Sequence, residues 1–232
     1  MSAGFLTDPL LMEWEVEHGF GLRGSSEPEG LARPRQVHGT AVARADAQGE
    51  VQPSEADAVW TDAPGRAVGV VTADCVPILM GVRGGARVAA VHAGWKGLAH
   101  GVIAAGLSAL RGSANEAVRV AIGPHVGPCC YEVDAPVLGP LRQRFGADLE
   151  LALVPTGPDH ARVDLGALAR RALESAGLPP HAIGTAAVGC TRCDADRFHS
   201  YRRDGARAGR LLHFARAGNR PGAALDSPQG PA

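Results

Sequence analysis

The sequence predicts an α+β fold: mixed β-sheets packed together and flanked by helices, in a single domain. Short apolar runs bounded by Gly and Pro indicate buried strands. Several strand pairs have connections too short for a helical crossover, which argues against a doubly wound parallel sheet. The 31 glycines and 17 prolines argue against a helical bundle. We expect the domain to span residues 1–217 and a Pro/Gly-rich disordered tail to span 218–232.

The predicted core strands carry mainly aliphatic residues, since the chain is 45% hydrophobic but only 4% aromatic. Residues 67–82 hold two apolar runs broken by TADC, and 87–91 form a further short strand that ends at His92. Further strands are expected at 119–122 and 186–190.

Helices are predicted between these strands. A helix over 97–112 carries apolar residues in i, i+4 order and ends at Gly112. A second is expected over 132–145. A third follows Asp164 as N-cap and ends with Gly177 as C-cap.

Charge and cysteine content exclude several classes of protein. The 23 basic and 24 acidic residues balance, and no basic stripe suggests a nucleic-acid partner. No apolar run reaches the roughly 20 residues that span a bilayer, and the N-terminus lacks the features of a secretory signal. We therefore expect no membrane partner and a cytoplasmic location. Five cysteines, two of them adjacent, make a disulfide framework a poor interpretation.

Three potential metal ligands lie in tight turns rich in small residues: His38 in QVHG, Cys75 in TADC and His92 in HAGW. Two imidazoles and one thiolate are typical of an open zinc site that keeps a position for water or substrate. Two alternatives stand beside this interpretation. The residues could be a turn histidine, a core thiol and a helix-start histidine, or Cys75 and His92 could form a thiol-hydrolase pair.

The other cysteines give a weaker pattern. Cys190 and Cys193 form one CxxC, which without a second pair is a weak indication of structural metal, and we interpret them as surface thiols. Cys129 and Cys130 lie in a Pro/Gly loop, where one is expected to face the pocket.

The segment FHSYRRDGARAGR contains Tyr201, Arg202 and Arg203 in one run. Arginine forks bind phosphate or carboxylate in a bidentate manner, so this run is a candidate anion site. The backbone amides at the start of the helix after His92 are another candidate anion site. A solvated basic turn is the simpler alternative for the arginine run.

Seven motifs in this order resemble one family: QVHG, ADAVWTD, TADCVPIL, HAGWKG, IGPHVGPCCYEV, DL and SYRRDGARAGR. It is the family called multicopper polyphenol oxidase (laccase-domain) protein, purine nucleoside phosphorylase or peptidoglycan-editing factor. The resemblance covers the chain from about His18 to Phe214. It implies a fold similar to the cysteine-hydrolase domain of a bacterial toxin.

The resemblance also implies a zinc site at His38, Cys75 and His92, which we assign as metal ligands and catalytic residues. It implies phosphorolysis of adenosine, inosine, guanosine and methylthioadenosine, and deamination of adenosine. The expected partners are therefore a nucleoside and phosphate, bound by a monomer or small homo-oligomer. We assign substrate binding to the following residues: Tyr201, Arg202, Arg203 and Cys130.

Three other functions compete with this one. A copper phenol oxidase is disfavoured, because laccase copper sites need HxH pairs and the nine histidines contain none. Editing of a peptidoglycan precursor, by removal of misincorporated serine from a UDP-muramoyl substrate, would use Cys75 or the metal against an amide. A non-catalytic binding module is disfavoured by the density of pocket-type motifs.

The chain departs from the family pattern in two places. Family members resemble HGFSTRxGGxS here and carry several tens of residues before QVHG, whereas HGFGLRGSSEPEGLARPRQVHG joins the two directly. The shorter connection leaves the substrate range open. His125 in GPHVG is an extra imidazole to which we assign no role.

Overall fold

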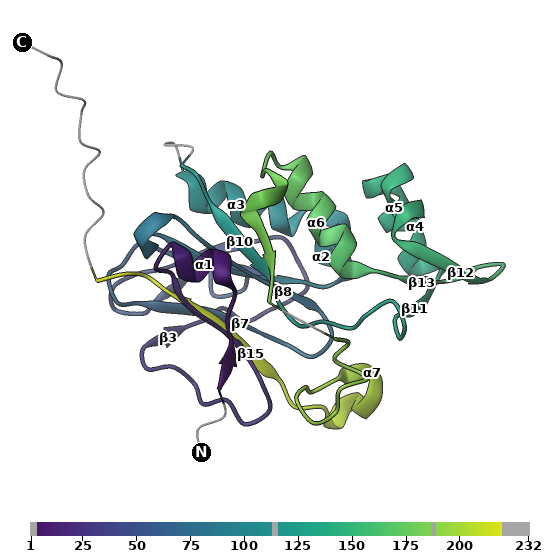
Figure 1. The fold of residues 1–232 in the computed structure, drawn as a ribbon, viewed down its shortest axis with the longest axis horizontal. Coiled ribbons are helices and arrows are strands. Elements are labelled where there is room, and N and C mark those ends of the chain that lie inside the picture. Colours follow the sequence, from purple (N-terminus) through teal and green to yellow (C-terminus); the bar gives the residue numbers. More distant parts are fainter. Residues whose placement is uncertain (1–3, 113–115, 187–188, 220–232) are drawn as a thin grey trace, which may run out of the picture.

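Three β-sheets and a layer of helices make up the fold in a computed structural model that describes residues 4–112, 116–186 and 189–219. Helices cover one face of a central seven-stranded sheet, and a five-stranded sheet covers the other (Figure 1). Each sheet of five or more strands contains both parallel and antiparallel pairs. The predicted α+β fold with packed mixed sheets in one domain is therefore confirmed.

The central sheet has the strand order β14-β10-β8-β9-β6-β4-β5. Its inner pairs are antiparallel, whereas β4–β6 and β10–β14 are parallel. The strands are β4 (Val42–Ala45), β5 (Val51–Gln52), β6 (Ala58–Thr61), β8 (Val76–Gly81), β9 (Val88–Ala93), β10 (Arg119–Ile122) and β14 (Ile183–Thr185).

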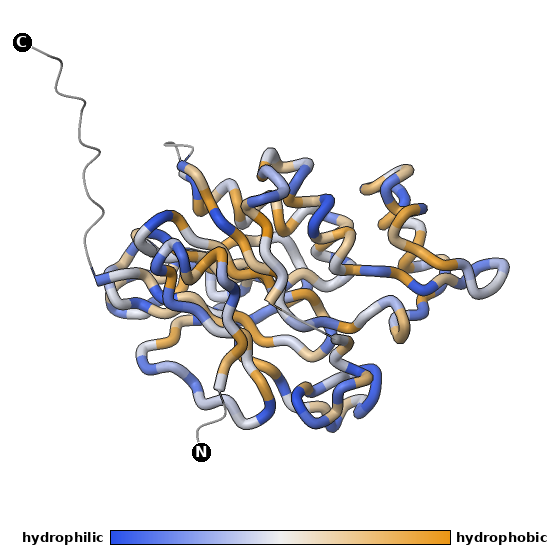
Figure 2. Tube along the Cα trace, viewed as in Figure 1, coloured by the Kyte–Doolittle hydropathy of each residue, from blue (hydrophilic) through white to orange (hydrophobic). Residues whose placement is uncertain are grey.

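Alternating side chains of the central strands fill two separate cores, because successive residues of a strand point to opposite faces. In β8, Ile78 packs toward the helices, whereas Leu79 packs toward the five-stranded sheet. In β10, Val120 and Ala121 divide in the same way. Strands β8 and β9 are buried along their whole length and mostly hydrophobic, because both faces are covered (Figure 2).

The five-stranded sheet has the order β1-β2-β15-β7-β3. Strand β15, near the end of the described chain, lies between β2 and β7 and pairs antiparallel with both. The strands are β1 (Phe5–Leu6), β2 (Glu17–Gly21), β3 (Leu31–Ala32), β7 (Ala67–Thr72) and β15 (Leu211–Arg216).

A small antiparallel sheet, ordered β11-β13-β12, stands at one end of the molecule beside α4 and α5 (Figure 1). Its strands are β11 (Glu132–Asp134), β12 (Leu153–Gly157) and β13 (His160–Val163). The α-helices are α1 (Pro9–Glu13), α2 (Trp95–His100), α3 (Val102–Arg111), α4 (Ala135–Phe145), α5 (Ala147–Leu151), α6 (Leu165–Ser175) and α7 (Tyr201–Asp204). Three 3₁₀ turns are also described: Arg83–Gly85, Pro180–Ala182 and Gly205–Arg207.

The helix predictions need three corrections. The smallest is that the third helix has Ala176, and not Gly177, as its C-cap. The helix expected over 97–112 begins at Trp95 and is two helices, because Gly101 adopts a left-handed φ of 90° that ends α2 and starts α3. The segment 132–145 is helical only from Ala135, since Glu132–Asp134 pairs as a strand and Asp134 caps α4. The predicted stop at Gly112 and the N-cap at Asp164 are confirmed.

Two further expectations concern the end of the chain. The strand expected over 186–190 is displaced to Ile183–Thr185, and Cys190 forms only an isolated bridge with His125. Residues 187–188 of that prediction, and 220–232 of the predicted tail, lie outside the described residues. Within the described residues, no helix has the length and apolar character needed to cross a membrane.

Candidate active site

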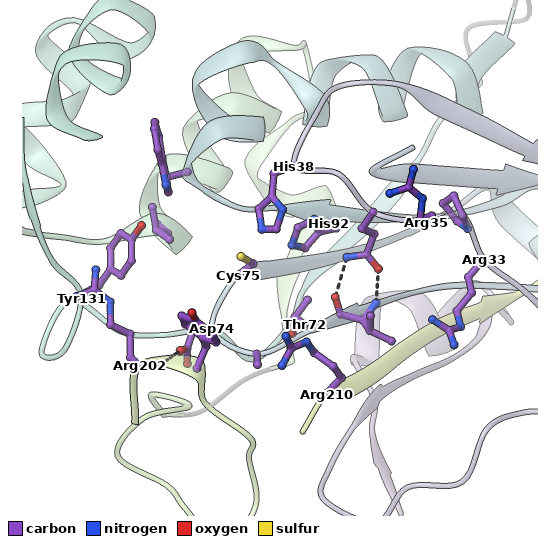
Figure 3. Close-up of a pocket in the computed structure, with 17 residues that line it drawn as sticks. Arg33, Arg35, His38, Thr72, Asp74, Cys75, His92, Tyr131, Arg202 and Arg210 are labelled. Atoms are coloured by element: carbon purple, nitrogen blue, oxygen red, sulfur yellow. Dashed lines mark hydrogen bonds between the residues drawn. The ribbon is translucent and has the colours of Figure 1, made fainter. Parts of the chain in front are cut away.

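The three residues predicted as metal ligands converge in space. One ligand atom from each of His38, Cys75 and His92 lies within 4.8 Å of the others. All three line a cavity of about 890 Å³, and they lie between its two walls in Figure 3. The three come from different segments: a loop before β4, the turn between β7 and β8, and strand β9. We call His38, Cys75 and His92 the ligand trio.

A buried carboxylate orients His92. The Nδ1 atom of His92 lies 2.8 Å from Oδ1 of Asp57, a residue with no exposed surface. Burial would lower the pKa of His92, but hydrogen bonds with Asp57 and Cys75 raise it to about 9. Because Nδ1 is engaged, Nε2 is the ring nitrogen left for the cavity, as in the carboxylate–histidine pairs that support metal ligands.

The same carboxylate fixes the loop that carries His38. It accepts backbone N–H groups from three successive residues: Val37 at 3.2 Å, His38 at 2.9 Å and Gly39 at 2.6 Å. These bonds, with that of His92, outweigh burial and lower the pKa of Asp57. His38 adopts a left-handed φ of 61° there, and its ring centroid lies 4.8 Å from that of His92. Asp57 thus joins two members of the ligand trio.

The Gln36 side chain attaches this loop to β7. Its amide nitrogen donates to the carbonyl of Val71, and its amide oxygen accepts the N–H of Val71, each at 2.8 Å. Both bonds are dashed in Figure 3. The Gln36 side chain therefore pairs with the backbone of Val71 as a neighbouring strand would. This pairing holds the His38 loop close to the TADC turn.

Cys75 follows β7 and precedes β8, and it is partly exposed to the cavity. Burial would raise the pKa of its thiol, but hydrogen bonds with His38 and His92 lower it to about 7. The thiolate form is both a better nucleophile and a metal ligand. The trio therefore favours the ionisation state that either chemistry needs.

Gly94 gives the trio room. A Cβ atom built at this position would lie 3.0 Å from Sγ of Cys75 and 3.2 Å from Cδ2 of His38. The glycine of HAGW, which caps α2, is therefore required by the close approach of the backbone to two ligands.

Asp74 connects the trio to the C-terminal segment. It is buried, has a left-handed φ of 90°, and its carboxylate accepts three hydrogen bonds. The donors are Thr191 Oγ1 at 2.6 Å, Ser200 Oγ at 3.1 Å and the Arg202 backbone N–H at 2.6 Å. The residue next to Cys75 thereby holds the segment that forms one wall of the cavity.

Arginine and aromatic side chains form the walls. In Figure 3, Tyr131 and Arg202 lie on one side of the trio, whereas Arg33 and Arg35 lie on the other. The Arg202 guanidinium lies 4.7 Å from the centroid of the Tyr131 ring. The remaining lining residues are Pro34, Gln36, Val71, Thr72, Ala73, Asp74, Trp95, Leu165, Tyr201 and Arg210. An anion and a planar ring are the ligand features that such walls can bind.

The predicted substrate-binding residues divide between two places. Tyr201 and Arg202 line the cavity. Arg203 does not, because its guanidinium donates to the backbone carbonyls of Thr191, Arg192 and Phe198. Cys130 also lies off the cavity lining, close to Cys193. The structure therefore does not bring these two side chains to the trio.

His125, the extra imidazole, is not among the residues that line the cavity either. Its Nδ1 atom lies 2.8 Å from the carbonyl oxygen of Gly123, and burial lowers its pKa. It packs against Gly166 of α6, where an added Cβ would meet its Nε2 atom at 2.4 Å. Helix α6 can therefore lie this close to His125 only because residue 166 is a glycine. We conclude that His125 supports the packing of this loop on α6.

Sequence reasoning missed Asp57, Asp74 and Gln36 as site residues. Each lies inside a motif already noted: Asp57 in ADAVWTD, Asp74 in TADC and Gln36 in QVHG. An acidic residue within an otherwise apolar strand region was the available indication for Asp57, because buried charges are kept only where they are paired. The role of Gln36 depends on a backbone partner 35 residues away and has no local signature.

Comparisons with known proteins show the family to which this chain is similar. Residues 22–217 match the model of the family described as multi-copper polyphenol oxidoreductase laccase. A purine nucleoside phosphorylase of Xylella fastidiosa (strain 9a5c) is 40% identical over 186 residues, covering 78% of this chain and 70% of the relative. The adenosine deaminase RL5 of an unknown prokaryotic organism is 31% identical over 192 residues, covering 78% and 73%.

A solved structure has the same fold. The hypothetical protein YfiH of Bacillus licheniformis superposes with a TM-score of 0.79 at 25% identity, covering 88% of this chain and 94% of that chain.

Proposed function

Because the chain belongs to the multi-copper polyphenol oxidoreductase laccase family, and relatives in it are named for purine nucleoside chemistry, we propose that it is a zinc-dependent purine nucleoside enzyme. The proposed reactions are phosphorolysis of adenosine, inosine, guanosine and methylthioadenosine, and deamination of adenosine. The observation that carries the proposal is the convergence of the ligand trio in one cavity lined by arginine and aromatic side chains.

The donor set fits zinc. Two imidazole nitrogens and one thiolate are ligands that zinc accepts, and three protein ligands leave one position open. Zinc bound by the trio would act as a Lewis acid and lower the pKa of a water molecule to about 7. Copper fits less well, because laccase-type sites need more histidines than the two gathered here.

The residues around the trio hold it ready for this chemistry. Asp57 holds a proton on Nδ1 of His92, so Nε2 is the nitrogen that would give up its proton to bind a metal. The backbone bonds of Asp57 fix the His38 loop at the same time. One buried carboxylate therefore bonds both the ring of His92 and the backbone of His38 and sets the distance between the two residues. Solvent does not screen these bonds, because Asp57 is buried.

The two walls suit the two substrates. Tyr131 and Trp95 offer aromatic surfaces for a purine base beside the trio. Arg33 and Arg210 offer guanidinium groups for phosphate, whereas Arg35 on the same lining already pairs with Glu55. The cavity of about 890 Å³ lies in the range of small-molecule sites and is large enough for a nucleoside and phosphate together.

The test is incubation of the purified protein with adenosine, with and without phosphate, followed by chromatography. We expect adenine that requires phosphate, and inosine that does not. Inosine or guanosine with phosphate should release the corresponding base. The His92→Ala variant should lose both activities together with one equivalent of zinc. Full activity and full zinc content in this variant would contradict the proposal.

Editing of a peptidoglycan precursor is the second candidate function, and one observation favours it. Cys75, His92 and Asp57 form a thiol–imidazole–carboxylate series, and the Cys75 pKa of about 7 suits a nucleophile. A fold similar to a cysteine-hydrolase toxin domain would support the same chemistry. In this reaction Cys75 would attack the carbonyl of the amide that joins a misincorporated serine to the UDP-muramoyl group. The C–N bond would break and serine would leave as the amine, and water would then hydrolyse the thioester to the carboxylate and free Cys75. Release of serine from UDP-muramoyl-serine, with no turnover of adenosine, would favour this function.

A further inference from the structure

Four of the five cysteines form a second cluster, away from the cavity lining. One sulfur from each of Cys129, Cys130, Cys190 and Cys193 lies within 4.8 Å of the others. We call these residues the four-cysteine cluster. All five cysteines of the chain are free thiols, and the fifth, Cys75, belongs to the ligand trio.

The sulfur positions agree with one tetrahedral ion. Zn–S bonds of about 2.3 Å place the sulfurs of a tetrahedral site about 3.8 Å apart. The Sγ atom of Cys193 lies 3.8 Å from that of Cys129 and 3.4 Å from that of Cys130. Both distances exceed the S–S bond of about 2.05 Å, so neither pair is a disulfide in this structure.

Two backbone turns bring the cysteines together. In the first, the N–H groups of Cys130 and Tyr131 donate to the carbonyl of Gly127 at 3.0 and 3.1 Å. In the second, the N–H groups of Cys193 and Asp194 donate to the carbonyl of Cys190, each at 3.1 Å. Each turn thus presents two thiols on one side.

The two turns are also fixed against each other. The Thr191 N–H donates to the carbonyl of His125 at 3.0 Å, beside the bridge between His125 and Cys190. At Gly127 an added Cβ would lie 3.2 Å from Cβ of Cys190 and 3.4 Å from Sγ of Cys129. The close approach therefore depends on backbone contacts and a glycine, and the thiol arrangement is built into the fold.

We propose that Cys129, Cys130, Cys190 and Cys193 bind one zinc ion as a closed structural site, separate from the ligand trio. Four thiolates leave no open position, which distinguishes a structural site from a catalytic one. Zinc with four thiolates carries a net charge of −2. The Arg192 guanidinium, whose Nη1 atom lies 3.4 Å from Sγ of Cys130, offsets part of that charge.

The proposed ion would hold one wall of the cavity. Tyr131 follows Cys130 directly and lines the cavity. Thr191 follows Cys190 and donates to Asp74, the neighbour of Cys75. The cluster joins residues about 60 positions apart at the point where both segments meet the site. Its role is therefore to fix Tyr131 and Thr191 relative to the trio.

Cobalt substitution tests the site by its spectrum. Thiolate-to-cobalt charge transfer scales with the number of thiolate ligands. The Cys75→Ser variant should keep about four-fifths of the charge-transfer absorbance of the wild-type protein, the share of four thiolates in five. The Cys129→Ser/Cys193→Ser double variant should lose most of it and one equivalent of zinc. Loss of the whole absorbance in the Cys75→Ser variant would overturn the proposal.

Alkylation of the unmodified chain gives a readout that does not depend on the folding of a variant. Cys129 and Cys193 are exposed, so without a metal both should react with iodoacetamide at alkaline pH. At neutral pH the reaction is slow, because partial burial of the Cys129 thiol and the hydrogen bond of Cys193 with Cys130 raise the pKa values of these two thiols. In the zinc-loaded protein we expect both to be protected, and a chelator to restore their reaction. Rapid alkylation with zinc retained would overturn the proposal. So would an intact mass that shows a disulfide within the cluster after purification in reductant.

Discussion

Asp57 Oδ1 accepts hydrogen bonds from His92 Nδ1 at 2.8 Å and from the backbone N–H of His38 at 2.9 Å. Two proposed ligands thus depend on one oxygen of a buried carboxylate. The third, Cys75, depends on no bond to Asp57 but on the neighbouring turn at Asp74. Removal of Asp57 should therefore misplace both histidines together.

We expect Asp57→Asn to lower zinc affinity at the trio about 10–100-fold, the usual effect of losing a carboxylate behind a histidine ligand. Activity should fall in parallel, and added zinc should restore part of it. Competition with a chromophoric chelator measures the affinity. Asp62→Asn is the matched control, because Asp62 lies in the same ADAVWTD motif but forms an exposed ion pair with Arg44. Equal affinities of the two variants would contradict the role of Asp57.

Gly94→Ala should remove the metal without unfolding the protein. Its Cβ would lie 3.0 Å from Cys75 Sγ, closer than nearly all such contacts, so the thiolate must move. Zinc content and circular dichroism on one sample separate the two effects. Gly139→Ala is the control, because that glycine lies in α4 with nothing within 4 Å of the added atom. The control should keep its zinc and gain up to about 1 kcal/mol of stability.

Arg202 and Arg203 are neighbours in sequence, and we expect different effects from them. Arg202→Ala should raise the KM for the nucleoside about tenfold, a loss of about 1.4 kcal/mol, since its side chain lines the cavity beside Tyr131. Its Tm should be unchanged.

Arg203→Ala should instead lower the Tm by about 4–10 °C, because three backbone carbonyls lose a charged donor worth about 1.5–3 kcal/mol in total. Thermal unfolding and Michaelis–Menten kinetics on both variants make the comparison. A Tm loss in the Arg202 variant alone would reverse the two assignments.

Stability should decrease as the pH falls below about 6.5, and His213 is a main cause. It is fully buried in β15 beside Thr72, where burial and then the charge of His92 lower its pKa to about 3. Between pH 6.5 and 3 the unfolded chain therefore binds a proton that the folded protein does not. The free energy of unfolding should fall by up to about 1.4 kcal/mol per pH unit from this group.

Urea titrations of the His213→Gln variant between pH 7 and 4 check this. The variant should show a shallower pH dependence than the wild-type protein, whatever its stability at pH 7. An unchanged slope would mean that other groups, such as the buried His18, carry the acid sensitivity.

The trio and the central strands β8, β9 and β10 could be predicted from the sequence, because each depends on local patterns. Strands β4, β5 and β6 of the same sheet were not predicted. The TADC break between two apolar runs became the turn between β7 and β8. The helix break at Gly101 and the helix start after Asp134 were missed. Glycine and proline occur near helix ends as well as at interruptions, so their presence in these segments did not mark the boundary.

The four-cysteine cluster could not be recognised, because its ligands are a CxxC and an adjacent pair rather than two CxxC motifs. The assignment of Cys130 and Arg203 to the substrate rested on motif proximity. Their positions depend on contacts between segments far apart in the chain.

The position of β15 has a consequence for synthesis on the ribosome. This strand is the last in the described chain, yet it lies between β2 and β7. All three members of the trio precede residue 93, so the ligands emerge long before the strand that closes the sheet beneath them. We expect the facing edges of β2 and β7 to stay unpaired in the nascent chain until β15 has been synthesised. A ribosome stalled before Leu211 should therefore hold a chain that a protease still cuts in both strands.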